Sequence, residues 1–405
     1  MFFSSAGEFA LVALFIVVTL LIRRSLQGSV LQVWLALGNV VLLSTLLTPA
    51  SIIVHAFLSV AVFFYGKYLK SNPSKKMLWM GILALIFLFV IRNYRTPLHA
   101  DQFELFDGPN GLISRLGISY ILFRHIQYLV DSKKGVRHFG NVLTYFNFII
   151  FFPNFLAGPI DKFNNFSRWF HRPNKKLLKA LYLPGLGRIG VGLIKKYGIV
   201  PLFYLEATNY EVLSADIGYG LGILFSLSLY SIYIYLDFSG YSDIAIGSGY
   251  LLGVKTPENF SNPYLARNIS DFWKRWHMTF SLFLRENIFM PFVKALSKAF
   301  PKAPRLSVSI FGYLFTFGLC GIWHGETVNF LYWGLWHGVG LILFKVWTLY
   351  FWKDRSKNWV GAKSYLTNGA SILVNFLFVT YGWLFFHYKG ESLSEIVYHI
   401  TGMHL

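Results

Sequence analysis

The chain has 405 residues, of which 55% are hydrophobic and only 14% are charged, and its formal net charge is +19. A soluble globular domain carries about 25% charged residues, so this composition excludes an ordinary cytosolic enzyme, a disordered chain and a fibrous repeat. The basic surplus lies mostly in short loops between apolar runs, as in membrane proteins, and not in a nucleic-acid-binding patch.

Apolar runs recur along the whole chain and predict a polytopic, all-α membrane protein. The uninterrupted runs are at about residues 8–22, 30–47, 50–66, 77–91, 112–130, 178–205, 217–236, 306–323, 329–350 and 369–386. Two further stretches, Phe139–Ile160 and Gly240–Val254, contain proline or several glycines and predict re-entrant or broken helices. We therefore expect ten or eleven spans around a central chamber, in one membrane domain covering residues 1–405.

The loop charges predict an orientation. Lys and Arg gather after the first, third and fifth runs, whereas acids gather at residues 101–107 and 206–216. The positive-inside rule places the basic loops in the cytoplasm and the N-terminus outside. The basic segment Lys162–Lys179 falls on the same side only if Phe139–Ile160 enters the membrane and returns. No Lys or Arg precedes the first run, so we expect it to remain as a span and not to be cleaved as a signal peptide.

Residues 256–305 differ from the rest of the chain because aromatic and basic residues are interleaved there. Phe272, Trp276, Phe280 and Phe283 recur at helical spacing. This pattern predicts amphipathic helices that lie at the cytoplasmic interface and do not span the membrane.

Three histidines have unusual surroundings. The pattern Gly-x-Trp-His-Gly occurs twice and contains His324 and His337, and His277 lies in the aromatic-basic segment. An ionisable group at membrane depth costs roughly 2.5–3.5 kcal/mol, which favours a functional role, although interhelical hydrogen bonding explains these histidines equally well. Neither HExxH nor a cysteine cluster is present, so no metal site is predicted. The lone Cys320 is expected in the core, and the GxGxxG match at 185–190 is expected in helix packing.

A polar stretch between apolar runs, Asp237-Phe-Ser-Gly-Tyr-Ser-Asp243, contains two carboxylates. It is compatible with a broken helix capped by Asp and Ser and with the wall of a polar cavity.

Four motifs in this order resemble the membrane-bound O-acyltransferase (MBOAT) family. They are Asp237–Asp243, Pro257-Glu-Asn-Phe-Ser-Asn-Pro263, Asp271-Phe-Trp-Lys-Arg-Trp-His277 and Gly321-Ile-Trp-His324-Gly. The segment Phe152–Phe163 and the C-terminal spans are most similar to the D-alanyl transfer proteins of this family. The resemblance covers nearly the whole chain.

The resemblance implies acyl transfer to a hydroxyl in a membrane-buried chamber. The family's active-site histidine corresponds to His324, its second motif position to His277, and His337 is an accessory position. His324 would act as general base, and His277, the Trp323 indole or backbone amides would stabilise the oxyanion. The residues expected to line the chamber are Asp237, Ser239, Tyr241, Asp243, Asn259, Trp273, Trp323 and His337.

The resemblance also implies the substrates and the location. The donor would be D-alanine held as a thioester on the 4'-phosphopantetheine of a small acidic carrier protein in the cytoplasm. The acceptor would be lipoteichoic acid outside a Gram-positive cell membrane. No permanently bound cofactor, metal or nucleic acid is expected, whereas membrane lipids and other membrane proteins of the D-alanylation pathway are expected partners.

The carrier protein is expected to dock on the cytoplasmic-side helices between residues 271 and 305. Apolar and basic side chains would contact it together: Met290, Phe292, Val293 and Leu296, with Lys294, Lys298, Lys302 and Arg305.

Two alternatives remain at this point. The first is an O-acetyltransferase of the same family that acts on a surface polysaccharide such as alginate or peptidoglycan. The second is a transporter or flippase, which broken helices and central glycines also permit.

Overall fold

The computed structural model describes residues 6–22, 28–93, 111–136, 140–171, 175–208, 219–325, 327–350 and 362–388, together with 392, 394 and 395. The elements in these ranges are helical, which confirms the predicted all-α class. The chain forms two compact units, residues 1–193 with 241–258 and residues 194–240 with 259–405. The prediction of one domain over residues 1–405 stays a prediction.

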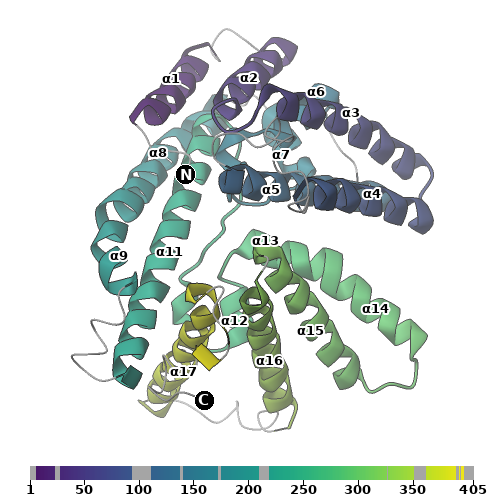
Figure 1. Cartoon of the computed structure of the whole chain (residues 1–405). Coiled ribbons are helices and arrows are strands. Elements are labelled where there is room, and N and C mark those ends of the chain that lie inside the picture. The colour runs from purple at the N-terminus through teal and green to yellow at the C-terminus, as the bar shows by residue number, and fades with distance from the viewer. Residues whose placement is uncertain are drawn as a thin grey trace. The chain divides into compact units, whose positions relative to one another are not determined.

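Unit 1 contains a series of long helices followed by short elements (Figure 1). The elements are α1 (Ala6–Ile22), α2 (Gly28–Leu43), α3 (Pro49–Ser71), α4 (Lys75–Asn93), α5 (Gly111–Lys133), α6 (Val142–Ile149), η2 (Phe152–Asn154), α7 (Phe163–His171) and α8 (Lys175–Leu193). Helix α5 packs on α3 and α4, and α6 packs on α2, α3 and α7. The stretch Phe139–Ile160 is indeed interrupted, because α6 ends at Ile149, before Pro153 and Gly158.

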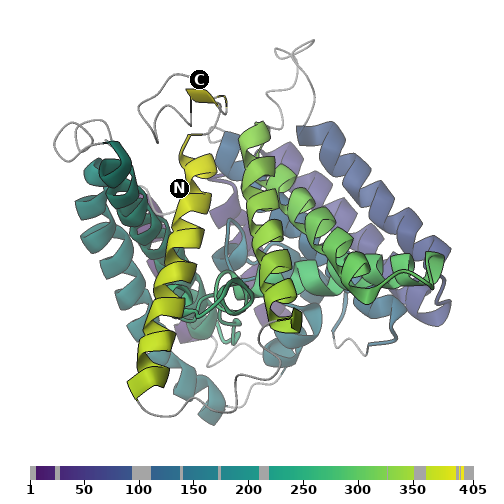
Figure 2. The same ribbon diagram turned by 90° about the horizontal axis from the view of Figure 1, so that it is seen from below.

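Unit 2 continues from a π-helical segment into the C-terminal helices. Its elements are η3 (Ile194–Ile199), α9 (Val200–Thr208), η4 (Pro263–Leu265), α12 (Ile269–Trp273), α13 (Met278–Leu284), η5 (Arg285–Phe289), α14 (Met290–Ala299), α15 (Arg305–His324), α16 (Val328–Tyr350) and α17 (Ala362–His387). Helix α16 packs against both α15 and α17, and α14 packs along α15 (Figure 2). Helix α11 (Tyr219–Leu251) contributes its first part to unit 2 and its last part to unit 1.

The prediction that Gly240–Val254 is a broken or re-entrant helix is wrong, because α11 runs without interruption from Tyr219 to Leu251. Its glycines serve close packing. A Cβ on Gly247 would lie 2.5 Å from the carbonyl oxygen of Gly185 on α8, so the two backbones meet where no side chain fits. The same contact confirms helix packing for Gly185, whereas a Cβ on Gly187 or Gly190 would meet nothing within 4 Å.

Residues 256–305 fold as short helices, and no candidate span lies among them. The four aromatic residues at helical spacing do not share one amphipathic helix, because the backbone of His277 turns into the left-handed region at φ 41° between α12 and α13. Each of these aromatics is buried in the unit. The prediction that they form the apolar face of an amphipathic helix is therefore wrong, because they are core residues; the location at the cytoplasmic interface stays a prediction.

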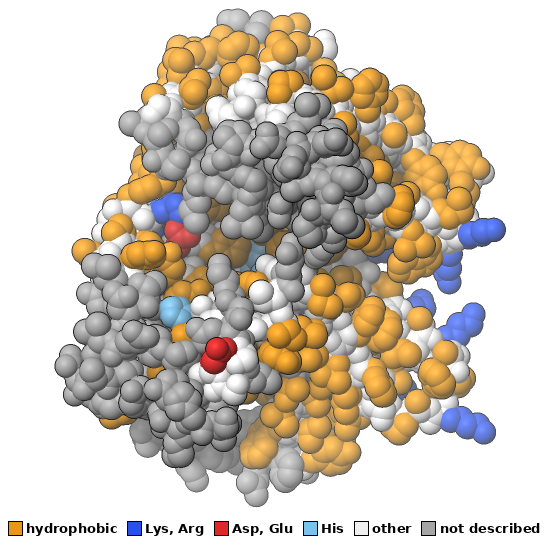
Figure 3. All heavy atoms as spheres, viewed as in Figure 1, with side chains coloured by type: hydrophobic (Ala, Val, Ile, Leu, Met, Phe, Trp, Pro, Cys, Tyr) orange, Lys and Arg blue, Asp and Glu red, His pale blue; other side chains and the backbone are white. Residues whose placement is uncertain are grey.

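Four helices of the described residues are long and apolar enough to span a membrane. They are Pro49–Ser71, Leu221–Leu251, Arg305–His324 and Asn368–His387, and the shorter helices Phe9–Ile22 and Gly28–Leu43 are also apolar. On the face seen in Figure 3, most described side chains are hydrophobic. Such a surface suits lipid and not water, as expected for an integral membrane protein. The count of ten or eleven spans stays a prediction.

Candidate functional site

His277 is held by the chain segment that precedes α12. The Nδ1 atom of His277 lies 3.0 Å from Oδ1 of Asn259, and the backbone N–H of Met278 donates to the Asn259 carbonyl at 2.8 Å. The motifs 257–263 and 271–277 are therefore joined by both side chain and backbone. Positive φ at His277 is costly for a residue with a Cβ and is usually retained at functional sites.

The hydrogen bonds of Asn259 fix the tautomer of His277. Its Oδ1 atom also accepts from the hydroxyl of Thr279 at 2.9 Å and from the Thr279 backbone N–H at 3.4 Å. Because a backbone N–H can only donate, this atom is the amide oxygen and Nδ1 of His277 carries the proton. Burial, with a smaller contribution from nearby His324, lowers the pKa of His277 well below its ordinary value. The ring is thus neutral, and Nε2 is its basic nitrogen.

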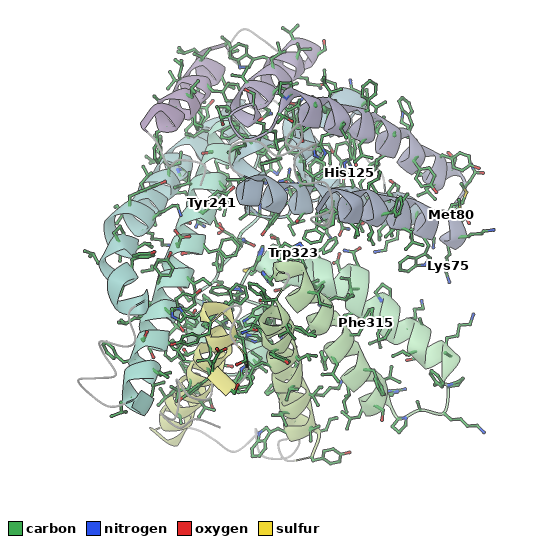
Figure 4. All side chains as sticks on the ribbon, in the orientation of Figure 1. Lys75, Met80, His125, Tyr241, Phe315 and Trp323 are labelled. Carbon is green, nitrogen blue, oxygen red and sulfur yellow. The ribbon has the colours of Figure 1, made fainter. Side chains whose placement is uncertain are left out.

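His324 ends α15 and lies among aromatic rings. Its ring centroid is 4.5 Å from Trp323, 4.9 Å from Trp333 and 5.1 Å from Phe386. The ring of Phe280 connects it to the second motif, since its centroid is 5.0 Å from His277 and 6.4 Å from His324. Trp323 is labelled on α15 in Figure 4. The structure thus brings the two predicted catalytic histidines to one aromatic residue.

The repeated Gly-x-Trp-His pattern marks the crossing of α15 and α16. A Cβ on Gly321 would lie 2.2 Å from the Phe330 carbonyl oxygen, and a Cβ on Gly334 would lie 2.1 Å from the Phe317 carbonyl oxygen. Each glycine precedes its histidine by three residues, so the crossing places both histidines beside the same ring. Trp333 lies 4.9 Å, centroid to centroid, from His324 and equally far from His337.

The polar stretch on α11 does not cap a broken helix. Asp237 pairs with Lys196 in unit 2, and Ser239 accepts from Lys195 at 3.3 Å. Asp243 pairs with Arg188 in unit 1. These carboxylates are therefore ion-paired residues of a continuous helix.

Tyr241 bonds in unit 1 to the Phe151–Phe155 region. Its hydroxyl donates to the carbonyl oxygen of Pro153 at 3.2 Å. The structure thus divides the eight predicted chamber residues: Asp237, Ser239, Asn259, Trp273, Trp323 and His337 belong to unit 2, whereas Tyr241 and Asp243 belong to unit 1.

Sequence reasoning missed the cationic partners Arg188, Lys195 and Lys196. All three lie within the long run predicted at 178–205, so the cost of placing a cation in an apolar helix could have identified them. Phe280 was noted for its spacing, but nothing in the sequence indicated its contact with both histidines.

The predicted docking residues differ in exposure, and not all of them lie on α14. Met290 is 51% exposed, and Lys294 and Lys298 on α14, Lys302 after it and Arg305 at the start of α15 are exposed, whereas Leu296 is half-buried. Val293 instead faces α15, where a Cβ on Gly312 would lie 2.6 Å from its Cγ2 atom. Phe292 stacks on Phe315 of α15, which is labelled in Figure 4, with ring centroids 4.1 Å apart. Phe292 and Val293 therefore hold α14 on α15 and are not free for a partner.

Within the described ranges, His, Cys, Asp and Glu form no group of three suited to a metal ion. Cys320 is buried, as expected for a core residue.

The fold is that of a helical membrane protein, and unit 2 holds a cluster of histidines among aromatic rings. A family model described as "MBOAT, membrane-bound O-acyltransferase family" matches residues 35–388. The chain belongs to this family and is a membrane-bound acyltransferase, which removes the transporter and flippase alternative.

Curated relatives fall into two groups. The teichoic acid D-alanyltransferase of Bacillus subtilis (strain 168) is 33% identical over 69% of this chain and 70% of its own length. The enzyme of the same name from Streptococcus thermophilus is 28% identical over 71% of this chain and 68% of its own length. A probable alginate O-acetylase of Pseudomonas syringae pv. tomato is 29% identical over 82% of this chain and 60% of its own length.

Proposed function

We propose that this acyltransferase moves D-alanine from a thioester on a cytoplasmic carrier protein to hydroxyl groups of lipoteichoic acid, with His324 as general base. The observation that carries the mechanism is the joint contact of His277 and His324 with Phe280. Similarity to the Bacillus subtilis teichoic acid D-alanyltransferase supports the choice of substrates.

The reaction needs one base and no enzyme-bound acyl intermediate. The acceptor hydroxyl oxygen attacks the thioester carbonyl carbon, so a C–O bond forms and the C–S bond breaks. The hydroxyl proton passes to a nitrogen of His324 and then to the leaving thiolate, which leaves an ester and a free phosphopantetheine thiol. A thioester is already activated, so no serine or cysteine nucleophile is required, and a positioned base contributes about 10²–10⁴-fold in rate.

His277 has a different role from His324. Its Nδ1–H is engaged with Asn259, so a neutral His277 offers a lone pair at Nε2 and cannot donate from that atom to an oxyanion. We therefore assign it to accept a hydrogen bond from the hydroxyl-bearing acceptor. The indole N–H of Trp323 or backbone amides then remain as oxyanion donors.

The carrier protein would deliver its phosphopantetheine arm after docking on α14. The exposed side chains of Met290, Lys294 and Lys298 suit an acidic partner with an apolar contact. Val293 packs on α15, so a substitution there would also disturb the fold. Met290→Asp therefore tests docking more directly. It should reduce carrier capture by purified protein more than tenfold and leave thermal stability unchanged. Normal capture by this variant would remove α14 as the docking site.

The deciding experiment is transfer of labelled D-alanine from loaded carrier to lipoteichoic acid in proteoliposomes, with the wild type and His324→Ala. The wild type should form an alkali-labile D-alanyl ester, and His324→Ala should not. Absence of ester with the wild type, under conditions in which the carrier stays loaded, would contradict the D-alanyl assignment.

Polysaccharide O-acetylation is the second candidate function. The alginate O-acetylases favour it because the alignment with the Pseudomonas syringae protein covers 82% of this chain, more than the alignment with the Bacillus subtilis enzyme. Deletion of the gene distinguishes the two. Loss of teichoic acid alanine ester supports D-alanyl transfer, whereas loss of sugar acetate with unchanged alanine ester supports acetyl transfer.

The orientation is part of the same proposal. An external N-terminus would place the basic loops and α14 on the cytoplasmic side of a Gram-positive cell membrane, where the carrier is found. Cysteine labelling of Gly7→Cys from outside intact cells should succeed, and labelling only after lysis would reverse the orientation.

A further inference from the structure

Three polar side chains in the interior of unit 2 have no hydrogen-bond partner among the described residues. They are His337, at both Nδ1 and Nε2, and Trp273 and Trp333, each at Nε1. All three are buried, and His337 is 0% exposed. Buried polar groups are almost always hydrogen-bonded, and an unpaired one is destabilising. Four such atoms lie in this one cluster, so a bound polar ligand would satisfy groups that the described protein residues leave unpaired.

The three rings lie close together. The His337 centroid is 5.1 Å from Trp273 and 4.9 Å from Trp333, and the two indoles are 6.0 Å apart. Further aromatic rings surround His337, namely Phe272 at 6.2 Å, Phe378 at 6.1 Å and Phe317 at 6.5 Å. The site thus combines indole N–H donors and an imidazole with an aromatic surround.

This combination suits an acyl group that carries a positive charge. Aromatic faces attract an ammonium group, more strongly when water is excluded, and a neutral imidazole supplies one lone pair to accept from it. Indole N–H groups can only donate, which suits a carbonyl oxygen. An α-aminoacyl thioester has both features, whereas an acetyl thioester has the carbonyl alone.

We propose that His337, Trp273 and Trp333 form the recognition site for the aminoacyl group of the donor. His337 accepts a hydrogen bond from the α-ammonium group, and the indoles donate to the acyl carbonyl oxygen. This inference rests on the proposed D-alanyl transfer and names the residues that select an aminoacyl donor over a simple acyl donor.

The position of the site agrees with the proposed chemistry. His324 and His337 both contact the ring of Trp333. In an alanyl group the carbonyl carbon and the amino nitrogen are about 2.5 Å apart. With a hydrogen bond at each end and an attacking hydroxyl between, the two imidazoles would be separated by on the order of 10 Å. One indole between the two histidines is compatible with that separation.

The test compares two donors that differ only in the amino group. Carrier loaded with D-alanine and carrier loaded with propionate are offered to the wild type, His337→Phe and Trp333→Phe in the same proteoliposome assay. The wild type should prefer the D-alanyl donor at least tenfold. His337→Phe should lose at least tenfold in D-alanyl transfer and stay within about twofold for propionyl transfer, while Trp333→Phe should lower both.

Two matched variants control for the loss of a buried or half-buried ring nitrogen. His55→Phe removes a buried imidazole from α3 in unit 1, and Trp336→Phe removes an indole that is bonded to the Phe378 carbonyl at 2.9 Å. Neither should change the ratio of the two donors. The ratio of D-alanyl to propionyl transfer is measured on the wild type alone. The inference therefore stays testable even if His337→Phe does not accumulate.

Each result has a definite meaning. Equal loss of both donors in His337→Phe, or no preference by the wild type, overturns the aminoacyl site but leaves D-alanyl transfer intact. A wild type that uses propionyl or acetyl carrier and not D-alanyl carrier overturns the proposed function, and the inference with it.

Discussion

Two buried polar side chains, Arg124 in unit 1 and His337 in unit 2, differ in how many hydrogen bonds they make. In unit 1, Arg124 is 1% exposed and donates to the carbonyl oxygens of Phe148 at 3.0 Å, Ile149 at 2.8 Å and Asn154. In unit 2, His337 is equally buried and has no hydrogen-bond partner among the described residues. Arg124 has three backbone acceptors and only its Nε is unpaired, whereas both ring nitrogens of His337 are unpaired among the described residues. We therefore interpret Arg124 as a structural residue, and the contrast supports the proposed binding role of His337.

The segment that Arg124 supports is a non-helical stretch inside unit 1. Asn39 accepts from the Phe152 backbone N–H at 3.0 Å, and the Tyr241 hydroxyl donates to the Pro153 carbonyl at 3.2 Å. Irregular backbone is tolerated in a buried position only when side chains complete its hydrogen bonds. The motif residues 152–163 are therefore explained, at least in part, by this bracing.

The largest expected effect follows from removing the brace. Arg124→Leu leaves three buried carbonyl groups without their donor, so unfolding free energy should fall by several kcal/mol, at about 1–3 kcal/mol per group. Thermal unfolding in detergent measures it, and the variant should be poorly retained in membranes. Arg124→Lys should recover part of the stability. A fully stable Arg124→Leu protein would refute the structural assignment.

The next largest effect is a loss of activity in a variant whose stability is unchanged. His324→Ala should lower D-alanyl transfer at least about a hundredfold, as expected for a deleted general base, with an unchanged unfolding temperature and normal carrier binding. Initial rates with loaded carrier provide the measurement. Near-normal transfer by His324→Ala, together with an inactive His277→Ala, would move the base to His277.

A smaller effect is expected where a partner only orients a histidine. Asn259→Leu removes the acceptor of the His277 Nδ1–H. It should reduce transfer about tenfold, similar to the smallest losses seen when the hydrogen-bond partner that orients a metal-binding histidine is removed. Thr279→Val removes one other donor to the same amide oxygen and should cost much less. Equal losses in both variants would indicate general disruption.

The pH profile tests the orienting role separately from folding. Asn259→Asp keeps an acceptor but adds a negative charge that favours imidazolium, so it should raise the pKa of His277. Because the neutral ring is the active form, the acidic limb of the rate profile should move to higher pH. An unshifted profile would exclude His277 from the titrating step.

A pH-dependent effect on stability is expected from a carboxyl group in unit 1. Burial raises the pKa of Asp161 to about 7, although hydrogen bonds from Asn165 and the Lys162 backbone and the charge of Arg124 oppose the shift. The folded state therefore holds a proton that the unfolded state releases near pH 4. Its stabilising contribution is complete below that pH and is lost as pH rises through about 7.

Asp161→Asn should remove this dependence. The difference in unfolding temperature between the wild type and the variant should change between pH 4 and pH 7 and then level off. A constant difference across that range would show that Asp161 is ionised throughout.

Local features of the sequence determined the class of protein. Long apolar runs with few charges require helices in a membrane, because hydrocarbon leaves no other way to satisfy the backbone. Motif order then indicated the family and the candidate histidines. The interruption at Pro153 and Gly158 was also predictable, since proline removes a helical hydrogen bond.

Tertiary structure decided what each of these residues contacts. Glycines within α11 predicted a break, but Gly247 instead allows α8 to approach closely. Whether a glycine interrupts its own helix or makes room for a neighbouring helix depends on the packing of that neighbour, which the sequence does not show. Val293 was predicted to be a docking residue, but in the structure it packs on α15. The tautomer of His277 and the missing partners of His337 depend on residues distant in sequence. They could not be predicted, because hydrophobic periodicity describes one helix at a time. The sequence therefore determined the family and indicated the candidate residues for the chemistry, and only the packed helices determined how these residues are held.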